Sequence, residues 1–155
     1  MEQVIECHPG KILEVLYEKE MWSIQKQWMA TFAKNSQGAN TKAYKWHTFS
    51  AGCYPSSEGE KARELYNNHS AHEYYIMAND DELVVLTDLK PETVDLLDYY
   101  VFPKNMAWCM AFTHEEGWLG PYFAKHPDYE KLNIDNQKQI EKEKQKAFAK
   151  SKGWT

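Results

Sequence analysis

The sequence predicts an α+β fold with one antiparallel or mixed sheet of about four to six strands and two or three packed helices on one side of it. Short apolar and aromatic runs typical of strands are interspersed with segments whose apolar residues recur at helical spacing. The most apolar run, 106–112, is expected near the centre of the sheet. A chain of 155 residues fits one domain, which we place at residues 1–130, followed at 131–155 by a Lys-rich C-terminal helix or tail.

The N-terminal third predicts two strands, a helix and a further strand. Val4–Cys7 and Ile12–Tyr17 are short apolar runs separated by a Pro-Gly turn. From Lys19 to Lys34 apolar residues recur at helical intervals, which indicates an amphipathic helix. Its apolar side would comprise Trp22, Trp28, Met29, Phe32 and Ala33. Lys42–Ser50 alternates and is rich in aromatic side chains, which favours a strand.

The middle of the chain predicts a helix followed by a β-hairpin. Ser57 and Glu60 stand in capping-box spacing, in which both side chains bind backbone N–H groups of the first helical turn. A helix is therefore expected over Glu58–Asn67, with Ala62, Leu65 and Tyr66 on its buried side. Glu73–Ala78 and Glu82–Thr87 are two strand candidates joined by the turn residues 79–81.

The last third predicts one short helix, two strands and a polar C-terminal segment. Pro91 suits the first turn of a helix that would run through Leu97. Tyr99–Phe102 and Met106–Thr113 are strand candidates. Ile134–Lys152 is rich in Lys, Gln and Glu and has few apolar anchors, so it is expected to be a marginal helix or a mobile tail.

Charge is unevenly distributed along the chain. The net charge is −5, yet Glu58–Asp98 alone holds eleven acidic and three basic side chains. Such a segment argues against direct nucleic-acid binding and favours attraction to a basic partner, although a solvated face that maintains solubility is an equal alternative. The seven Lys from residue 131 onward alternate with acidic residues and are typical of a solvated helix.

The cysteines and the N-terminus indicate the compartment. Cys7, Cys53 and Cys109 cannot all pair within the chain and lack zinc-ligand spacing, which favours a reducing environment. The N-terminus lacks the features of a signal peptide, and no window is apolar enough to span a bilayer. We therefore expect a cytoplasmic protein without membrane contact. Cys109 is expected to be a buried apolar residue, and Cys53, near His47, to be the candidate reactive thiol.

The segment Thr113–Phe123 has the densest chemistry, because eleven residues hold an imidazole, two carboxylates, aromatic rings and glycines. It is either a site or a corner where a buried strand turns. A candidate pocket would be formed by His114, Glu115 and Trp118, joined by His47. The structural alternative is a histidine bonded to backbone at a turn, with glycines supplying the required conformations, and we favour this alternative over catalysis.

No resident metal or cofactor is predicted. His69 and His72 would share a face if the preceding helix continued that far, and Glu73 would add an oxygen ligand. A polar helix end explains the same pair more simply. The chain has no phosphate-binding glycine loop, nucleophile elbow or dinucleotide fingerprint, which removes the commonest enzyme classes.

Four segments together resemble a known family. They are Gln25-Lys26-Gln27-Trp28 with Phe32, Trp46-His47-x-Phe49-Ser50, Glu58-Gly59-x-Lys61-Ala62, and the closing Thr113-His114-Glu115-x-Gly117-Trp118-x-Gly120-Pro121-Tyr122-Phe123. Over roughly residues 20–124 they resemble the bacterial domain-of-unknown-function family numbered 4275. Leu119, where that family commonly has Cys, and the Lys-rich extension after residue 124 are departures. The resemblance implies a small bacterial cytoplasmic protein and carries over no reaction.

Two functions remain as hypotheses. The first is a non-enzymatic protein-binding module, specifically an immunity protein that neutralises a basic, nuclease-like bacterial toxin by covering its active or substrate-binding surface. The candidate partner-binding residues are Glu58, Glu60, Glu64, Asp80, Asp81 and Glu82. The alternative is a small enzyme or ligand-binding protein whose pocket lies near His114, Glu115 and Trp118.

Overall fold

The computed structural model describes residues 5–34, 44–79, 83–114 and 119–153. Within these ranges the fold is α+β, as predicted. The helices are α1 Glu18–Phe32, α2 His47–Ser50, α3 Glu60–Asn67 and α4 Tyr129–Ser151. The strands are β1 Cys7–His8, β2 Ile12–Leu16, β3 Ser57–Glu58, β4 Tyr74–Ala78, β5 Val84–Thr87, β6 Thr93–Val94, β7 Tyr99–Pro103, β8 Trp108–Phe112 and β9 Tyr122–Lys125.

Seven of the described strands form one antiparallel sheet in the order β2-β5-β4-β7-β8-β9-β3, and β1 pairs with β6 separately. The expected β-hairpin is confirmed, because β4 pairs with β5 from Tyr74 opposite Thr87 to Met77 opposite Val84. The sheet is larger than predicted because β9 and the two-residue β3 extend it beyond β8. Segments this short carry no alternating pattern, so their pairing partner determines that they are strands.

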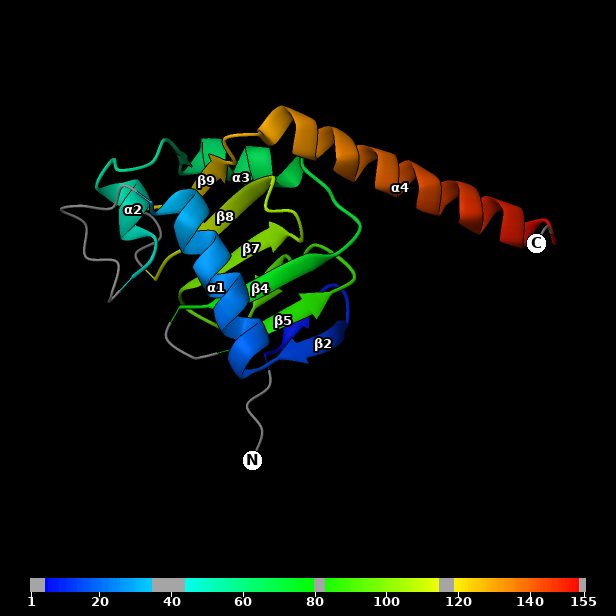
Figure 1. Cartoon of the computed structure of the whole chain (residues 1–155), viewed down its shortest axis with the longest axis horizontal. Coiled ribbons are helices and arrows are strands. Elements are labelled where there is room, and N and C mark those ends of the chain that lie inside the picture. The colour runs from blue at the N-terminus through cyan, green and yellow to red at the C-terminus, as the bar shows by residue number, and fades with distance from the viewer. Residues whose placement is uncertain (1–4, 35–43, 80–82, 115–118, 154–155) are drawn as a thin grey trace.

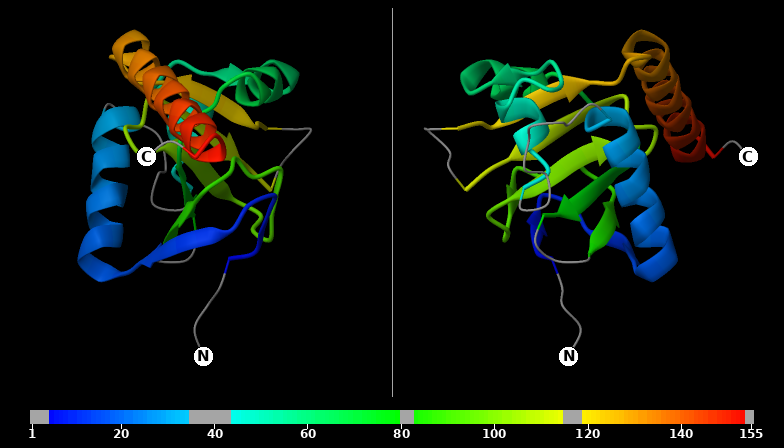
Figure 2. Two further views of the ribbon diagram at one scale, coloured as in Figure 1. Left: turned by 90° about the vertical axis from the view of Figure 1, so that its right-hand side faces the viewer. Right: turned by 60° about the vertical axis from the view of Figure 1, so that its left-hand side comes forward.

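Helices cover both faces of the sheet, which corrects the expectation that they pack on one side. One face carries α1 and α2, whose buried Trp28, Phe32 and Phe49 pack with strand residues such as Tyr100 (Figures 1 and 2). The other face carries α3, whose Ala62 and Tyr66 belong to a second buried cluster. Side chains of a strand alternate between faces, so consecutive residues such as Tyr99 and Tyr100 contribute to different clusters.

The helix α1 forms where an amphipathic helix was predicted, but a different stripe of it is buried. Met21, Ile24, Trp28 and Phe32 recur at intervals of three and four residues and face the sheet. Trp22, which the sequence analysis placed on the apolar side, is 51% exposed. An indole can remain at a wet surface because its N–H is satisfied by water.

Two predicted elements are wrong. Lys42–Ser50 is not a strand in its described part, because residues 47–50 form α2. Trp46, Thr48 and Phe49 are all buried, so the segment does not have the two-sided character of a strand. The helix expected after Pro91 is also absent from these described residues, where Thr93–Val94 form β6 and Leu97 is 76% exposed. The pairing of β6 with β1 uses backbone groups that a helix would have bonded internally.

The start of α3 differs from the predicted capping box. Ser57 and Glu58 are extended and pair with β9, so the helix begins at Glu60. Gly59 occupies the N-cap position at φ 67°, and no side chain caps the helix there. A positive φ is readily adopted by glycine, and it turns the chain from strand to helix within one residue.

The predicted alternative of a C-terminal helix or tail is resolved in favour of a helix, α4. Asn105 Nδ2 donates to the Leu132 carbonyl at 3.0 Å, and Asn136 Nδ2 donates to Asn105 Oδ1 at 3.3 Å. Tyr129 and Leu132 are half-buried against the α3 side of the sheet. No residue of α4 is fully buried, and Figure 1 shows its C-terminal part extending past the sheet. Among the described residues, no helix is both long and apolar enough to cross a membrane.

Candidate functional site

The carboxylate of Asp98, which directly precedes β7, is a buried polar group with several hydrogen-bond partners. Its side chain is 4% exposed and accepts hydrogen bonds from Trp46 Nε1 at 3.0 Å and from the His114 backbone N–H at 3.0 Å. The imidazole Nδ1 of His114 lies 2.9 Å from both carboxylate oxygens. An ionised carboxylate can accept hydrogen bonds but cannot donate them, so Nδ1 carries the proton in this contact.

A second branch of the same network passes through Tyr100 in β7. The Tyr100 hydroxyl accepts the Trp46 backbone N–H at 2.9 Å and donates to Asn79 Oδ1 at 2.8 Å. Asn79 Oδ1 also accepts the Lys45 backbone N–H at 3.0 Å. We refer to Asp98, Trp46, Tyr100, Asn79 and His114 as the Asp98 network. It ties α2 to β7 and to the end of β8, which explains why the segment around Trp46 folds as a helical turn.

The structure brings His47 and His114 to the same end of the sheet, with an aromatic ring beside each. The Tyr44 ring lies 5.3 Å from the His47 ring and 5.1 Å from the His114 ring, measured between centroids. The His114 side chain is 31% exposed. Glu115 and Trp118, the other members of the predicted pocket, lie outside the described residues.

The pairing of His114 with a buried carboxylate is chemically significant because it fixes the orientation and tautomer of the imidazole. Such pairs position histidines in general acid–base catalysis, and they also serve as plain structural contacts. Sequence reasoning missed Asp98 and grouped His114 with Glu115, Trp118 and His47 in a candidate pocket instead. The one available signal was an acidic residue placed immediately before the apolar run that forms β7.

The structure describes three of the six predicted partner-binding carboxylates. Glu58, Glu60 and Glu64 are exposed and lie on β3 and α3. Glu58 also has an internal role, because its Oε2 accepts the Gly120 backbone N–H at 3.0 Å. Asp80, Asp81 and Glu82 lie outside the described residues. The strand ends that flank them, in β4 and β5, are separated from β3 by β7, β8 and β9 in the sheet.

The His69 and His72 pair does not share a helical face, because α3 ends at Asn67. His69 Nδ1 lies 2.6 Å from the Leu65 carbonyl and Nε2 lies 2.5 Å from the Tyr129 hydroxyl. The carbonyl requires a proton on Nδ1, whereas the Tyr129 hydroxyl can donate to Nε2 or accept from it. Burial lowers the pKa of His69. His72 instead lies 3.6 Å from Glu73. Over the described ranges, no group of three or more His, Cys, Asp or Glu side chains could hold a metal.

The C-terminal end of α3 is capped by a lysine from a distant loop. Lys90 Nζ donates to the carbonyls of Tyr66 at 2.5 Å, Asn67 at 3.3 Å and His69 at 2.6 Å. A cation at this end of a helix satisfies orphan carbonyls and interacts favourably with the helix dipole. Burial lowers the pKa of Lys90.

Cys109 is a buried apolar residue, as predicted. Trp28 Nε1 donates to its Sγ at 3.2 Å, and burial raises the pKa of the thiol to about 12. Such a thiol is inert as a nucleophile. Cys53 is half-buried after α2, and its expected reactivity stays a prediction.

The described parts of Thr113–Phe123 serve the fold. Gly120 has φ 83°, and a Cβ there would lie 3.0 Å from the Thr113 side chain. Thr113 Oγ1 donates to the Leu119 carbonyl, and Gly59 N donates to the Pro121 carbonyl at 2.9 Å. The rings of Tyr122 and Phe123 stack on those of Trp46 and Trp108 respectively, on opposite faces of the sheet.

Residues 11–123 match the model of a family described as a domain of unknown function, DUF4275. The chain belongs to this family. The DUF4275 match begins just before β2 and ends within β9, so it contains the whole seven-stranded sheet apart from the last residues of β9. It also contains the Asp98 network, whereas α4 lies beyond it. No curated protein and no solved structure matches the chain.

Proposed function

We propose that this DUF4275 protein is a non-enzymatic protein-binding module of the cytoplasm, specifically an immunity protein that neutralises a basic, nuclease-like bacterial toxin. Binding would cover the toxin's active or substrate-binding surface. The observation that carries the proposal is the exposed carboxylates of Glu60 and Glu64 on α3, on a chain of net charge −5. Complementary charge accelerates encounter with a basic partner and selects against acidic ones.

The described interior supports a binding role because its titratable groups are engaged in the fold. The Asp98 carboxylate is bonded to Trp46 and His114, and His69 is bonded to Leu65 and Tyr129. Such contacts rigidify the scaffold that presents a binding surface.

The test is binding to the toxin encoded beside this gene, measured by calorimetry and by association kinetics at low and moderate salt. We expect a tight complex whose association rate falls when Glu60→Lys and Glu64→Lys are combined. The matched control combines Glu141→Lys and Glu143→Lys on α4, which changes the net charge equally. Glu58 is left intact because its carboxylate also binds Gly120. Absence of a complex, or equal slowing by both double variants, would refute the proposal.

The second candidate, a small enzyme or ligand-binding protein, is supported by the Asp98–His114 pair. A buried carboxylate that orients an imidazole is suited to a general base. If the protein is an enzyme, His114→Gln should abolish its catalytic activity. If the protein is an immunity protein, the same substitution should leave toxin binding unchanged. Neutralisation assays with the purified His114→Gln variant distinguish the two.

A further inference from the structure

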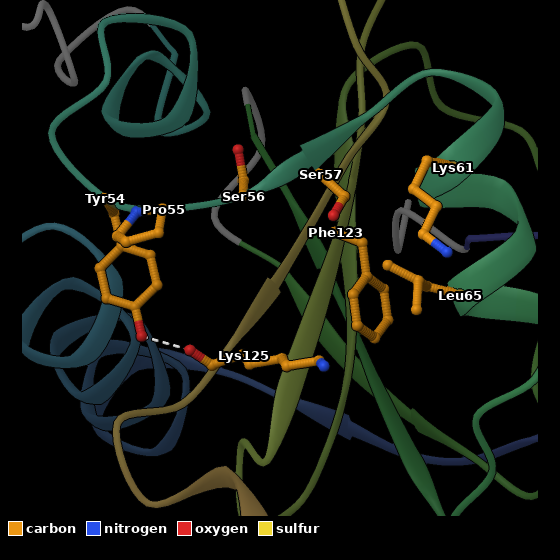
Figure 3. Close-up of a pocket in the computed structure, with 8 residues that line it drawn as sticks. All are labelled: Tyr54, Pro55, Ser56, Ser57, Lys61, Leu65, Phe123 and Lys125. Carbon is orange, nitrogen blue, oxygen red and sulfur yellow. Dashed lines mark hydrogen bonds between the residues drawn. The ribbon is translucent and has the colours of Figure 1, made fainter.

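A cleft of about 610 Å³ lies at the β3 edge of the sheet, between β3, α3 and the end of β9 (Figure 3). Its described lining residues are Tyr54, Pro55, Ser56, Ser57, Lys61, Leu65, Phe123 and Lys125. Small-molecule sites typically have volumes of roughly 300–1,000 Å³. The cleft is distinct from the Asp98 network and from the exposed carboxylates of α3.

The local structure explains why these side chains meet. Ser57 lies opposite Phe123 in the antiparallel pairing of β3 with β9, so both point to the same face. Lys125 follows Phe123 by two residues on β9 and shares that face. Lys61 and Leu65 are four residues apart on α3 and therefore neighbours along one side of the helix.

The cleft combines two cationic groups with an apolar wall. Figure 3 shows Lys61 and Lys125 on either side of the Phe123 ring, with Tyr54 and Pro55 opposite α3. Tyr54 donates its hydroxyl hydrogen to the Lys125 carbonyl, which fixes the position of that wall. The ammonium group of Lys125 lies 4.7 Å from the centre of the Tyr129 ring.

The charge of the residues that line the cleft is opposite to that of the chain as a whole. None of the described lining residues is acidic, although the chain has net charge −5. Among the described side chains, neither Lys61 nor Lys125 lies within ion-pairing distance of a carboxylate. These two ammonium groups and the Ser57 hydroxyl, which points toward Phe123 in Figure 3, form a donor set suited to the charged oxygens of a phosphate.

We propose that this cleft binds a small organic phosphate, in which a phosphate ester carries a ring or a short apolar group. The ammonium groups of Lys61 and Lys125 and the hydroxyl of Ser57 hold the phosphate. The apolar group packs against Tyr54, Pro55 and Leu65. This role is independent of the proposed partner surface.

The test is titration of the full chain with phenyl phosphate, followed by calorimetry and by NMR shifts of the cleft residues. Phenol and inorganic phosphate are the two matched probes, since each lacks one half of phenyl phosphate. We expect phenyl phosphate to bind most tightly and the affinity to fall as salt is raised. Phenol binding as tightly as phenyl phosphate would overturn the proposal.

Lys61→Gln provides the decisive variant. Lys61 is exposed and forms no ion pair with another described residue, so its substitution should leave the fold intact. Its affinity for phenyl phosphate is expected to fall roughly tenfold or more. Lys26→Gln on α1, which lies over the opposite face of the sheet, is the control and should bind normally. Equal affinities of the Lys61→Gln variant and the unmodified protein would refute the site. Lys125→Gln should weaken binding similarly, with thermal unfolding checking that α4 stays docked.

Discussion

The Asp98 network and α4 use polar residues in opposite ways, since the network buries them in hydrogen bonds and α4 exposes them to solvent. In the network, one nearly buried carboxylate is shared by an indole and a histidine, and the surrounding rings of Trp46 and Tyr100 are at most 1% exposed. In α4, no residue is fully buried, and Ile134 and Phe148 are each 55% exposed.

The difference indicates which region contributes most to the free energy of unfolding and which region stays accessible. Loss of the shared Asp98 carboxylate would leave the buried donors of Trp46 and His114 unsatisfied, so the network is sensitive to substitution. A helix docked mainly through its first two turns contributes little to the free energy of unfolding and remains accessible to a partner. The family match divides the chain in the same way, because it includes the network and ends before α4.

The largest effect is expected from Asp98→Ala. This change leaves the N–H groups of Trp46 and His114 without their acceptor inside the protein. We expect the free energy of unfolding to fall by about 3 kcal/mol or more, because each buried unsatisfied group costs about 1–3 kcal/mol. Urea unfolding followed by tryptophan fluorescence measures this change.

The matched control is Asp135→Ala on the exposed surface of α4. Surface substitutions of this kind usually change the stability by no more than about 0.5 kcal/mol. If both variants lost the same stability, the contrast between the two regions would be wrong.

A smaller effect is expected from pH, at the point where α4 joins the body. Burial lowers the pKa of His69, so the unfolded chain binds a proton at pH values where the folded chain does not. Stability therefore falls as the pH drops below about 6.5, until the pH reaches the lowered pKa of the folded state. One such group contributes a slope of at most about 1.4 kcal/mol per pH unit.

His69→Gln should reduce this slope below about pH 6.5, as measured by urea unfolding at a series of pH values. His72→Gln, three residues later at an exposed position, should leave it unchanged. An identical pH profile for the unmodified protein and the His69→Gln variant would show that another group titrates. The comparison also tests the contact of His69 with Tyr129, the first residue of α4.

Local patterns in the sequence were sufficient for the elements that have strong patterns of their own. The β4–β5 hairpin and α1 were predicted within one or two residues because hydrophobic periodicity is set by local burial. Two-residue strands such as β3 and β6 have no period, so their existence depends on partners far along the chain. The segment that became α2 was misassigned because an aromatic-rich run favours a strand, and the sequence does not show that the neighbours Thr48 and Phe49 are both buried.

The candidate sites depended still more on distant contacts. His114 was identified from sequence, but its carboxylate partner is 16 residues away and was not. The cleft beside Phe123 needs Lys61 and Lys125, which only the pairing of β3 with β9 brings together. Neither arrangement leaves a motif in the sequence, because each is created by tertiary packing.

The smallest effect on stability is expected when residues 144–155 are removed. The hydrogen bonds described between α4 and the body join Asn105 to Leu132 and Asn136, and His69 to Tyr129, so they all remain in the shortened chain. The unfolding free energy should change by less than about 0.5 kcal/mol, because exposed residues without such contacts contribute little. A larger loss would mean that the end of α4 packs on the body. If instead stability is retained but toxin binding weakens, the exposed Phe148 belongs to the partner surface, and the acidic residues of α3 would be only part of it.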